Sequence, residues 1–155
     1  MQFKLVIKST FSEYPLNEND YPCLIDEPKI AVIKSSWESD LSEINMILED
    51  TYPIEPKQIP RQKRKLPTIK ISRNDENDVG RHFSQKLIES VINEARGLSN
   101  GTTVNVYATT NPMNTFNIAN RAFKNATRGN IAELYVYQQE STGNRLFVRK
   151  GRKVH

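Results

Sequence analysis

The alternation of strand-like and helix-like segments over residues 68–155 is the strongest constraint on the fold. Residues 68–73 and 102–109 alternate apolar with polar side chains, as a half-buried strand does. Residues 131–139 and 145–149 show the same alternation and are joined by a short turn that contains glycine, which predicts a C-terminal β-hairpin. Helix-like segments separate the strands, so this region has the order β-α-β-α-β-β.

The two helix-like segments each have a start and a stop. In the first, apolar residues recur every four positions from Val79 to Ala95, the spacing of one helix face. Candidate N-caps for it are Asn74, Asp75 and Asn77. The second begins at Asn111-Pro112, a cap followed by proline in the first turn, and ends at Gly129.

The N-terminal third predicts two strands and one further helix. Residues 2–8 alternate as an amphipathic strand, and residues 30–33 form a short apolar run typical of a buried strand. Ser35 with Glu38 three residues later matches a capping box. The helix expected after it carries apolar residues at helical spacing: Trp37, Leu41, Ile44 and Leu48. The whole chain is therefore predicted to be α+β, with a mixed sheet of about five to six strands, three helices and a C-terminal β-hairpin.

Residues 53–67 are predicted to form an extended, exposed linker. Four prolines surround the basic run Arg61-Gln62-Lys63-Arg64-Lys65, and proline cannot donate to a sheet ladder. We interpret residues 1–155 as a single domain with a possible seam at 53–67. The seam would divide an acidic β-β-α part, residues 1–52, from a basic β-α-β-α-β-β part, residues 68–155.

The charge is distributed unevenly along the chain. Residues 1–56 contain 4 Lys and Arg against 11 Asp and Glu, a net charge of −7, whereas residues 57–155 contain 18 against 7, a net charge of +11. An uneven charge distribution of this kind gives information about binding partners and self-association rather than about the fold. The two regions could attract each other within one fold or head-to-tail between copies, as in a homo-oligomer, or the basic part could contact a polyanion such as RNA or DNA.

Of these alternatives, the predicted C-terminal hairpin favours contact with a polyanion. A loop at Ser141-Thr142-Gly143 with a left-handed Gly143 would pair Glu140 with Asn144 and Val136 with Val148. One face of the hairpin would then carry aromatic rings between guanidinium groups, an arrangement that stacks on unpaired bases and contacts phosphates: Tyr135, Tyr137, Phe147, Arg145 and Arg149. The alternative is that a second layer covers this face and the rings belong to the core.

Other cations could extend that surface. The helix after Asn111 presents Arg121, Lys124 and Arg128 at spacings of three to four residues, which places them on one face. The sequence thus predicts a non-enzymatic nucleic-acid-binding domain, with RNA favoured over DNA. A self-assembling structural protein, such as a phage or viral component, is a second possibility.

Catalysis is left open by the sequence. A small metal-independent ribonuclease, such as a toxin, needs only an acid or base and cations near the phosphate, and His82, Tyr137 and Arg145 are weak candidates for those roles. No His, Cys, Asp and Glu cluster has zinc-ligand spacing, and no glycine-rich phosphate loop occurs. We therefore expect no metal and no cofactor.

Neither a signal peptide nor a membrane span is expected, since no run of about 18 apolar residues occurs. The single cysteine, Cys23, lies between apolar neighbours and is predicted to be a buried hydrophobic residue. One cysteine cannot form an internal disulfide, which suits a reducing compartment. We expect a cytoplasmic protein without a membrane partner.

Overall fold

The computed structural model describes residues 6–8, 13–15, 18–24, 27, 29–38, 41–73 and 82–155. Its strands are β1 (Val6–Lys8), β2 (Glu13–Pro15), β3 (Ala31–Ser35), β4 (Glu43–Glu49), β5 (Thr68–Ser72), β6 (Thr102–Ala108), β7 (Ile131–Tyr137) and β8 (Arg152–Lys153). Its helices are the 3₁₀ turns η1 (Glu18–Asp20), η2 (Pro56–Gln58) and η3 (Arg61–Lys63), the α-helix α1 (Gln85–Arg96), and a continuous run of α2 (Pro112–Asn117), the π-helical η4 (Ile118–Phe123) and α3 (Lys124–Ala126).

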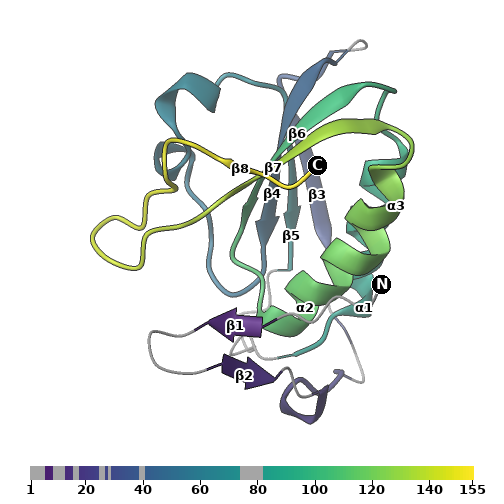
Figure 1. The fold of residues 1–155 in the computed structure, drawn as a ribbon, viewed down its shortest axis with the longest axis vertical. Coiled ribbons are helices and arrows are strands. Elements are labelled where there is room, and N and C mark those ends of the chain that lie inside the picture. Colours follow the sequence, from purple (N-terminus) through teal and green to yellow (C-terminus); the bar gives the residue numbers. More distant parts are fainter. Residues whose placement is uncertain are drawn as a thin grey trace.

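The main sheet has six strands in the order β3-β5-β4-β6-β7-β8. Strands β5, β4, β6 and β7 are parallel, and the edge strands β3 and β8 are antiparallel to their neighbours. The predicted α+β class and mixed sheet are therefore confirmed. From β4 the chain moves outward to β5 and then returns past β4 to β6, so the connections change direction beside β4. A separate two-stranded sheet, β1-β2, lies below the lower end of the main sheet in Figure 1.

The two faces of the sheet are covered by different kinds of structure. Both long helical segments pack on one face, at the right in Figure 1, and form the larger core with residues such as Ile44, Ile69 and Val91. Residues 53–67, here called the covering segment, and the C-terminal loop of residues 138–151 lie on the other face, at the left. A smaller core sits beneath them, formed by Ile47, Ile54, Ile59, Tyr107, Tyr137 and Phe147.

The helix predicted from Ser35 is wrong, because this part of the chain forms strands β3 and β4. Ser35 ends β3, and Ser36 turns with a φ of 52°. In β4 the burial is continuous from Ile44 to Leu48, as expected for a central strand covered on both faces. Ile44 and Leu48 are four residues apart, and that spacing fits the period of a strand as well as that of a helix.

The prediction of an extended, exposed linker at residues 53–67 is also wrong. Pro56 begins the first of two 3₁₀ turns, and Ile54, Ile59 and Pro60 are buried. Three ion pairs join acidic residues that begin, end or follow β4 to basic residues of the covering segment, of β5 or directly after β5: Glu43–Lys63, Glu49–Lys70 and Asp50–Arg73. The acidic and basic regions thus attach to each other within the chain, while the single domain with a possible seam at residues 53–67 stays a prediction.

Helix boundaries were predicted with mixed success. Asn111 caps α2 by accepting a hydrogen bond from the backbone N–H of Asn114, as expected. The helix α1 begins at Gln85 with Ser84 as its cap, and the predicted start at Val79, with the caps Asn74, Asp75 and Asn77, lies outside the described residues. Of the predicted strand 2–8, only residues 6–8 are described, in β1. Cys23 is exposed, which corrects the expectation that it is buried.

The C-terminal hairpin has a different register from the predicted one. Gly143 is left-handed, with a φ of 64°, as expected. However, Gln139 pairs with Phe147, and Val136 pairs with Arg152 of β8 instead of with Val148. Arg145 also has a positive φ, 51°, so the turn is wider than the three-residue loop that we assumed.

Candidate functional site

The aromatic face predicted for the hairpin exists, but it is closed. Tyr137 and Phe147 are only 6% and 4% exposed, because the covering segment lies over them. Both rings pack on Tyr107 of β6: the Tyr137 ring stacks at 4.5 Å between centroids, and the Phe147 ring meets it edge-on at 5.2 Å. Tyr135 is half-buried at the margin of this cluster. The rings form a core, as in the alternative interpretation, and do not offer an open stacking surface.

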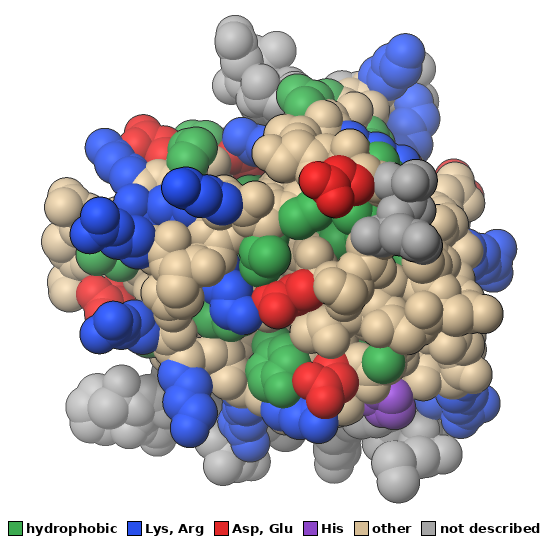
Figure 2. Space-filling view, turned by 90° about the horizontal axis from the view of Figure 1, so that it is seen from above, with side chains coloured by type: hydrophobic (Ala, Val, Ile, Leu, Met, Phe, Trp, Pro, Cys, Tyr) green, Lys and Arg blue, Asp and Glu red, His purple; other side chains and the backbone are tan. Residues whose placement is uncertain are grey.

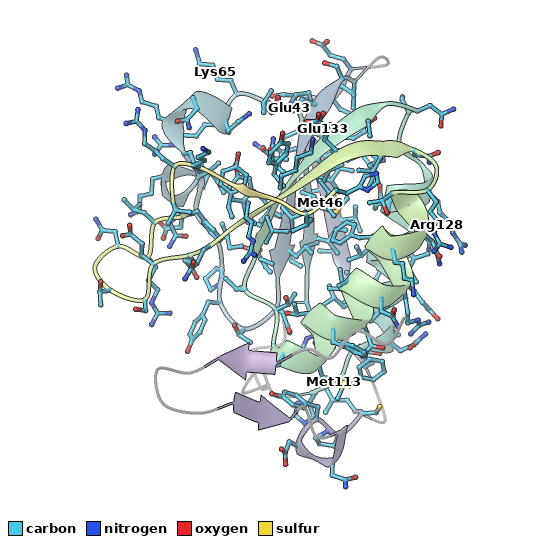
Figure 3. All side chains as sticks on the ribbon, viewed as in Figure 1. Glu43, Met46, Lys65, Met113, Arg128 and Glu133 are labelled. Carbon is cyan, nitrogen blue, oxygen red and sulfur yellow. The ribbon has the colours of Figure 1, made fainter. Side chains whose placement is uncertain are left out.

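The predicted cations do not share one surface. Arg145 lies over the ring of Tyr52, 4.6 Å from its centroid, on the same side of the sheet as the covering segment. Arg121 donates to Gln85 Oε1 at 2.9 Å and therefore lies on the helical side. Lys124 and Arg128 follow it along the same helical run, and Figure 3 shows Arg128 far from the covering segment. Of the predicted cations, Arg149 lines a cavity that also contains the predicted tyrosines Tyr135 and Tyr137.

The three weak catalytic candidates are also separated. The backbone oxygen of His82 accepts hydrogen bonds from Asn111 and Asn114, at 2.8 and 3.1 Å, which fixes it at the carboxyl ends of the parallel strands. Tyr137 and Arg145 lie on the face of the covering segment. His82 therefore does not lie beside Tyr137 and Arg145.

A buried polar network occupies the carboxyl end of the sheet. Asp50, directly after β4, forms an ion pair with Arg73, directly after β5, and the two side chains are 0% and 1% exposed. Asp50 Oδ2 also accepts hydrogen bonds from the backbone N–H of Asn111 and from Asn114 Nδ2, both at 2.9 Å. Open sheets with parallel strands usually bind ligands at this end, where the connections change direction. In this chain the carboxylate of Asp50 lies at that position and accepts the hydrogen bonds of Asn111 and Asn114, which are then not available to a ligand.

Cavities lie at both ends of the parallel strands: one of about 500 Å³ borders Asp50 and Arg73 at the carboxyl end, and another lies at the amino end. The cavity at the amino end has a volume of about 350 Å³ and lies between the starts of β4, β6 and β7, the turn η3 and residues 149–151, here called the C-terminal segment. Its lining residues are Glu43, Lys63, Thr103, Asn105, Glu133, Tyr135, Tyr137, Arg149, Lys150 and Gly151. Figure 3 labels Glu43 and Glu133 at this end of the sheet. Figure 2 looks onto the same end and shows acidic side chains among apolar and basic ones, with many basic side chains on the left, the side of the covering segment. We call it the amino-end cavity.

One wall of the amino-end cavity is an ion pair between β4 and the covering segment. Lys63 Nζ lies 2.6 Å from Glu43 Oε2, and the same oxygen accepts a hydrogen bond from Asn105 Nδ2 at 2.8 Å. Burial raises the pKa of the Glu43 carboxyl, but the two hydrogen bonds outweigh it and leave the pKa below its usual value. The hydrogen bond to Glu43 raises the pKa of Lys63. Both side chains are therefore charged at neutral pH.

The opposite wall is built by β7, and a lysine of β8 reaches one of its carboxylates. The Tyr135 hydroxyl donates to Glu133 Oε2 at 2.8 Å, and Lys153 Nζ approaches Glu133 Oε1 at 3.4 Å. The Tyr135 hydrogen bond, with help from Lys153, lowers the pKa of Glu133, and the same hydrogen bond raises the pKa of Tyr135. Beneath the cavity, burial raises the pKa of Tyr107. Displaced pKa values thus gather at this end, as they do at many functional sites.

The remaining wall is the backbone near Gly151. A Cβ atom at this position would lie 2.6 Å from Cε2 of the Tyr137 ring, so the chain can cross the ring this closely only with glycine. Gln62 of η3 donates to the backbone oxygen of Arg149 at 3.2 Å. The covering segment and the C-terminal segment are therefore joined directly above the cavity.

The family of the chain is shown by a match over residues 1–154 to the model of the SMODS- and Ubiquitin system-associated 2TM effector domain (SUa-2TM). The chain belongs to the SUa-2TM family. No curated protein matches it. The family's description contains "2TM", yet in the described part of the chain no helix is long and apolar enough to cross a membrane.

Membership of the SUa-2TM family corrects the predicted function. The family is described as an effector domain, so the prediction of a nucleic-acid-binding domain, with its ribonuclease and assembly alternatives, is wrong. The structure agrees in one respect: the open aromatic and cationic surface on which that prediction depended is not formed. Among the described residues, no group of three or more His, Cys, Asp and Glu side chains is placed to hold a metal ion.

Most residues of the amino-end cavity are not recognisable as a site from the sequence. Glu43 was assigned to a helix, and Lys63 was treated as one charge of an exposed linker. Asn105 alternates with apolar residues in β6 and, although only 1% exposed, looks like an ordinary polar position of a half-buried strand. Only the tyrosines and Arg149 were singled out in advance. For the other lining residues, such as Glu43 and Lys63, the sequence offers one indication: the net charge changes from negative to positive at residues 53–67.

Proposed function

We propose that this chain is an effector domain whose action is controlled by a small organic anion, a phosphate or carboxylate compound, bound in the amino-end cavity. The observation that supports this most directly is the state of two cations in its lining. The side chains of Arg149 and Lys150 form no hydrogen bond or ion pair with any described residue, whereas Lys63 in the same lining is neutralised by Glu43. Unpaired cations beside a polar cavity attract an anionic group.

The size of the cavity limits the class of ligand. A volume of about 350 Å³ is at the lower end of the range for small-molecule sites, roughly 300–1,000 Å³. The half-buried ring of Tyr135 provides an apolar surface, and Thr103 and Asn105 provide hydrogen-bonding groups. These features suit a compact molecule with one or two acidic groups.

The position of the cavity suggests how a ligand would act on the rest of the domain. The lining includes Lys63 of the covering segment, and Gln62 beside it holds the C-terminal segment through the oxygen of Arg149. A ligand that draws Arg149 and Lys150 inward would therefore tighten the contact between these two segments. The family's description, an effector domain associated with SMODS and ubiquitin systems, supports a role in which such a change is passed to a partner.

Thermal unfolding in the presence of small anions tests the proposal. Citrate and pyrophosphate should raise Tm more than sodium chloride of equal ionic strength does, because they bind the folded state alone. The double variant Arg149→Ala/Lys150→Ala should lose this increase. The matched control is Arg61→Ala/Lys65→Ala, which removes the same charge from exposed positions of the covering segment outside the cavity lining. Equal responses to the anions and to sodium chloride, or equal loss in both variants, would refute the proposal.

A further inference from the structure

The two edges of the main sheet differ in how well they are protected. At one edge, β8 is two residues long, and both residues are exposed cations, Arg152 and Lys153. Short length and charge are the usual means by which an edge strand avoids pairing with another chain. At the other edge, β3 is five residues long and exposed along its whole length. In the part of the chain that the structure describes, β3 pairs with β5 alone, and no described strand lies along its outer edge.

The side chains of β3 give little protection to that edge. Ile33 is 60% exposed and Val32 is 40% exposed. The one charged residue is Lys34, and its ammonium group is drawn away to Glu94 of α1, at 3.1 Å, and to the ring of Trp37, 5.0 Å from the centroid. A lysine held in this way does not repel an approaching strand. An edge with a row of free backbone groups and exposed apolar residues is a template for strand addition.

We propose that β3 pairs with β3 of a second copy of this chain, antiparallel and centred on Ile33. Alternate residues of β3 point their backbone N–H and C=O groups away from β5, and a second β3 would satisfy them. In this register Ile33 faces Ile33 of the second copy, and Val32 faces Lys34 of the second copy. Lysine is therefore not placed directly opposite lysine, and each Lys34 keeps the carboxylate of Glu94 in its own chain. The edge is thus complementary to itself, as a two-fold interface requires.

A hollow beside Ile33 supports this choice of partner. A cavity of about 160 Å³ lies between β3 and the covering segment, and most of its exposed lining is apolar. Its apolar lining residues are Ile33, Ile47, Ile54, Pro56 and Ile59. The two Ile33 side chains of an antiparallel pair lie on the same sheet face, next to this hollow in each copy. Pairing would shield both side chains and join the two sheets into one.

The amino-end cavity would stay open in such a dimer. It lies among β4, β6 and β7, whereas β3 is at the opposite edge of the sheet from β8. Dimerisation and anion binding are therefore separate properties, and an experiment that refutes one of the two proposals does not refute the other.

Sedimentation over a concentration series tests the dimer. The wild type should sediment as a concentration-dependent dimer, and Ile33→Lys should weaken the dimer by at least about tenfold, since two lysines would face each other. Val154→Lys is the matched control: Val154 is 53% exposed beside β8 at the opposite edge, so its replacement should leave the dimer unchanged. A strictly monomeric wild type, or a dimer that persists in Ile33→Lys, would overturn the proposal.

Cross-linking gives a second test that fixes the register and does not require a disruptive variant. In a Cys23→Ser background, Ile33→Cys places two thiols opposite each other at a separation that a disulfide can span. Mild oxidation should produce a covalent dimer with Ile33→Cys and none with Val154→Cys. If both variants cross-link equally, or neither does, the β3 pairing is wrong.

Discussion

The two ends of the parallel strands carry opposite kinds of polar site. At the carboxyl end, the Asp50–Arg73 ion pair is almost completely buried, and Asp50 also accepts hydrogen bonds from Asn111 and Asn114. At the amino end, the Glu43–Lys63 pair is more than a quarter exposed and borders the amino-end cavity. The comparison teaches that the charged groups at the carboxyl end are paired and buried, so they serve the stability of the fold, whereas the cavity at the amino end is lined by two cations, Arg149 and Lys150, that are unpaired among the described residues.

The largest expected effect is at the carboxyl end. Asp50→Asn keeps the shape of the side chain but removes its charge, so Arg73 loses its buried counter-ion. We expect the free energy of unfolding to fall by about 3–5 kcal/mol, the usual cost of breaking a buried pair from one side. Urea denaturation measures it. A loss similar to that of Glu43→Gln would mean that the two ends do not differ as described.

A smaller loss is expected where the chain crosses Tyr137. Gly151→Ala adds a Cβ 2.6 Å from a ring that is itself stacked on Tyr107, so the ring or the backbone must shift. We expect a destabilisation of about 1–3 kcal/mol, typical of overpacking, in the same urea experiment. Gly129→Ala is the control, since its Cβ would come no closer than 3.9 Å to Ala126 O. Equal effects in the two variants would show that the C-terminal segment is not held closely against the ring.

The smallest effect is expected for the amino-end ion pair. Glu43→Gln should lower the free energy of unfolding at pH 7 by about 1 kcal/mol, because the pair is partly exposed and screened by solvent.

The same ion pair has a defined pH dependence. The pKa of Glu43 is lower in the folded state than in the unfolded state, so its contribution is present above the unfolded pKa, about 4.3. The difference between wild type and Glu43→Gln should shrink as the pH falls from that value through the folded pKa. The pKa of Lys63 is raised, so the difference should also shrink in strong alkali, above about pH 10.4. Denaturation at several pH values checks both limits, and a difference that grows in acid would contradict the assignment.

The amino-acid pattern was sufficient for the class of fold and for several elements. Strands β5, β6 and β7 and the body of α1 follow from local periodicity, and the helix after Asn111 follows from its cap as well. Both signals depend on nearby residues alone, and the cap of α1 at Ser84 was not among those predicted. The covering segment was not predictable in this way. Its prolines indicate an extended linker, and only the sheet face beneath Ile54 and Ile59 makes burial of the segment favourable.

The candidate site was even less visible in the sequence. Glu43, Lys63, Asn105 and Glu133 are separated by up to 90 positions and belong to four different elements, so no local spacing connects them. The tyrosines of β7 were found because alternation places them on one face, but alternation does not reveal what covers that face. Whether that face is buried depends on the path of the covering segment, which local sequence does not determine.

The sequence by itself determined the α+β class, the alternating strands and the reversal of charge near residue 57. Only the tertiary structure decided which face is closed, which residues line the amino-end cavity and which edge strand is exposed along its length. The physical reason is that periodicity and capping are local properties, whereas burial and ion pairing depend on segments brought together from distant parts of the chain.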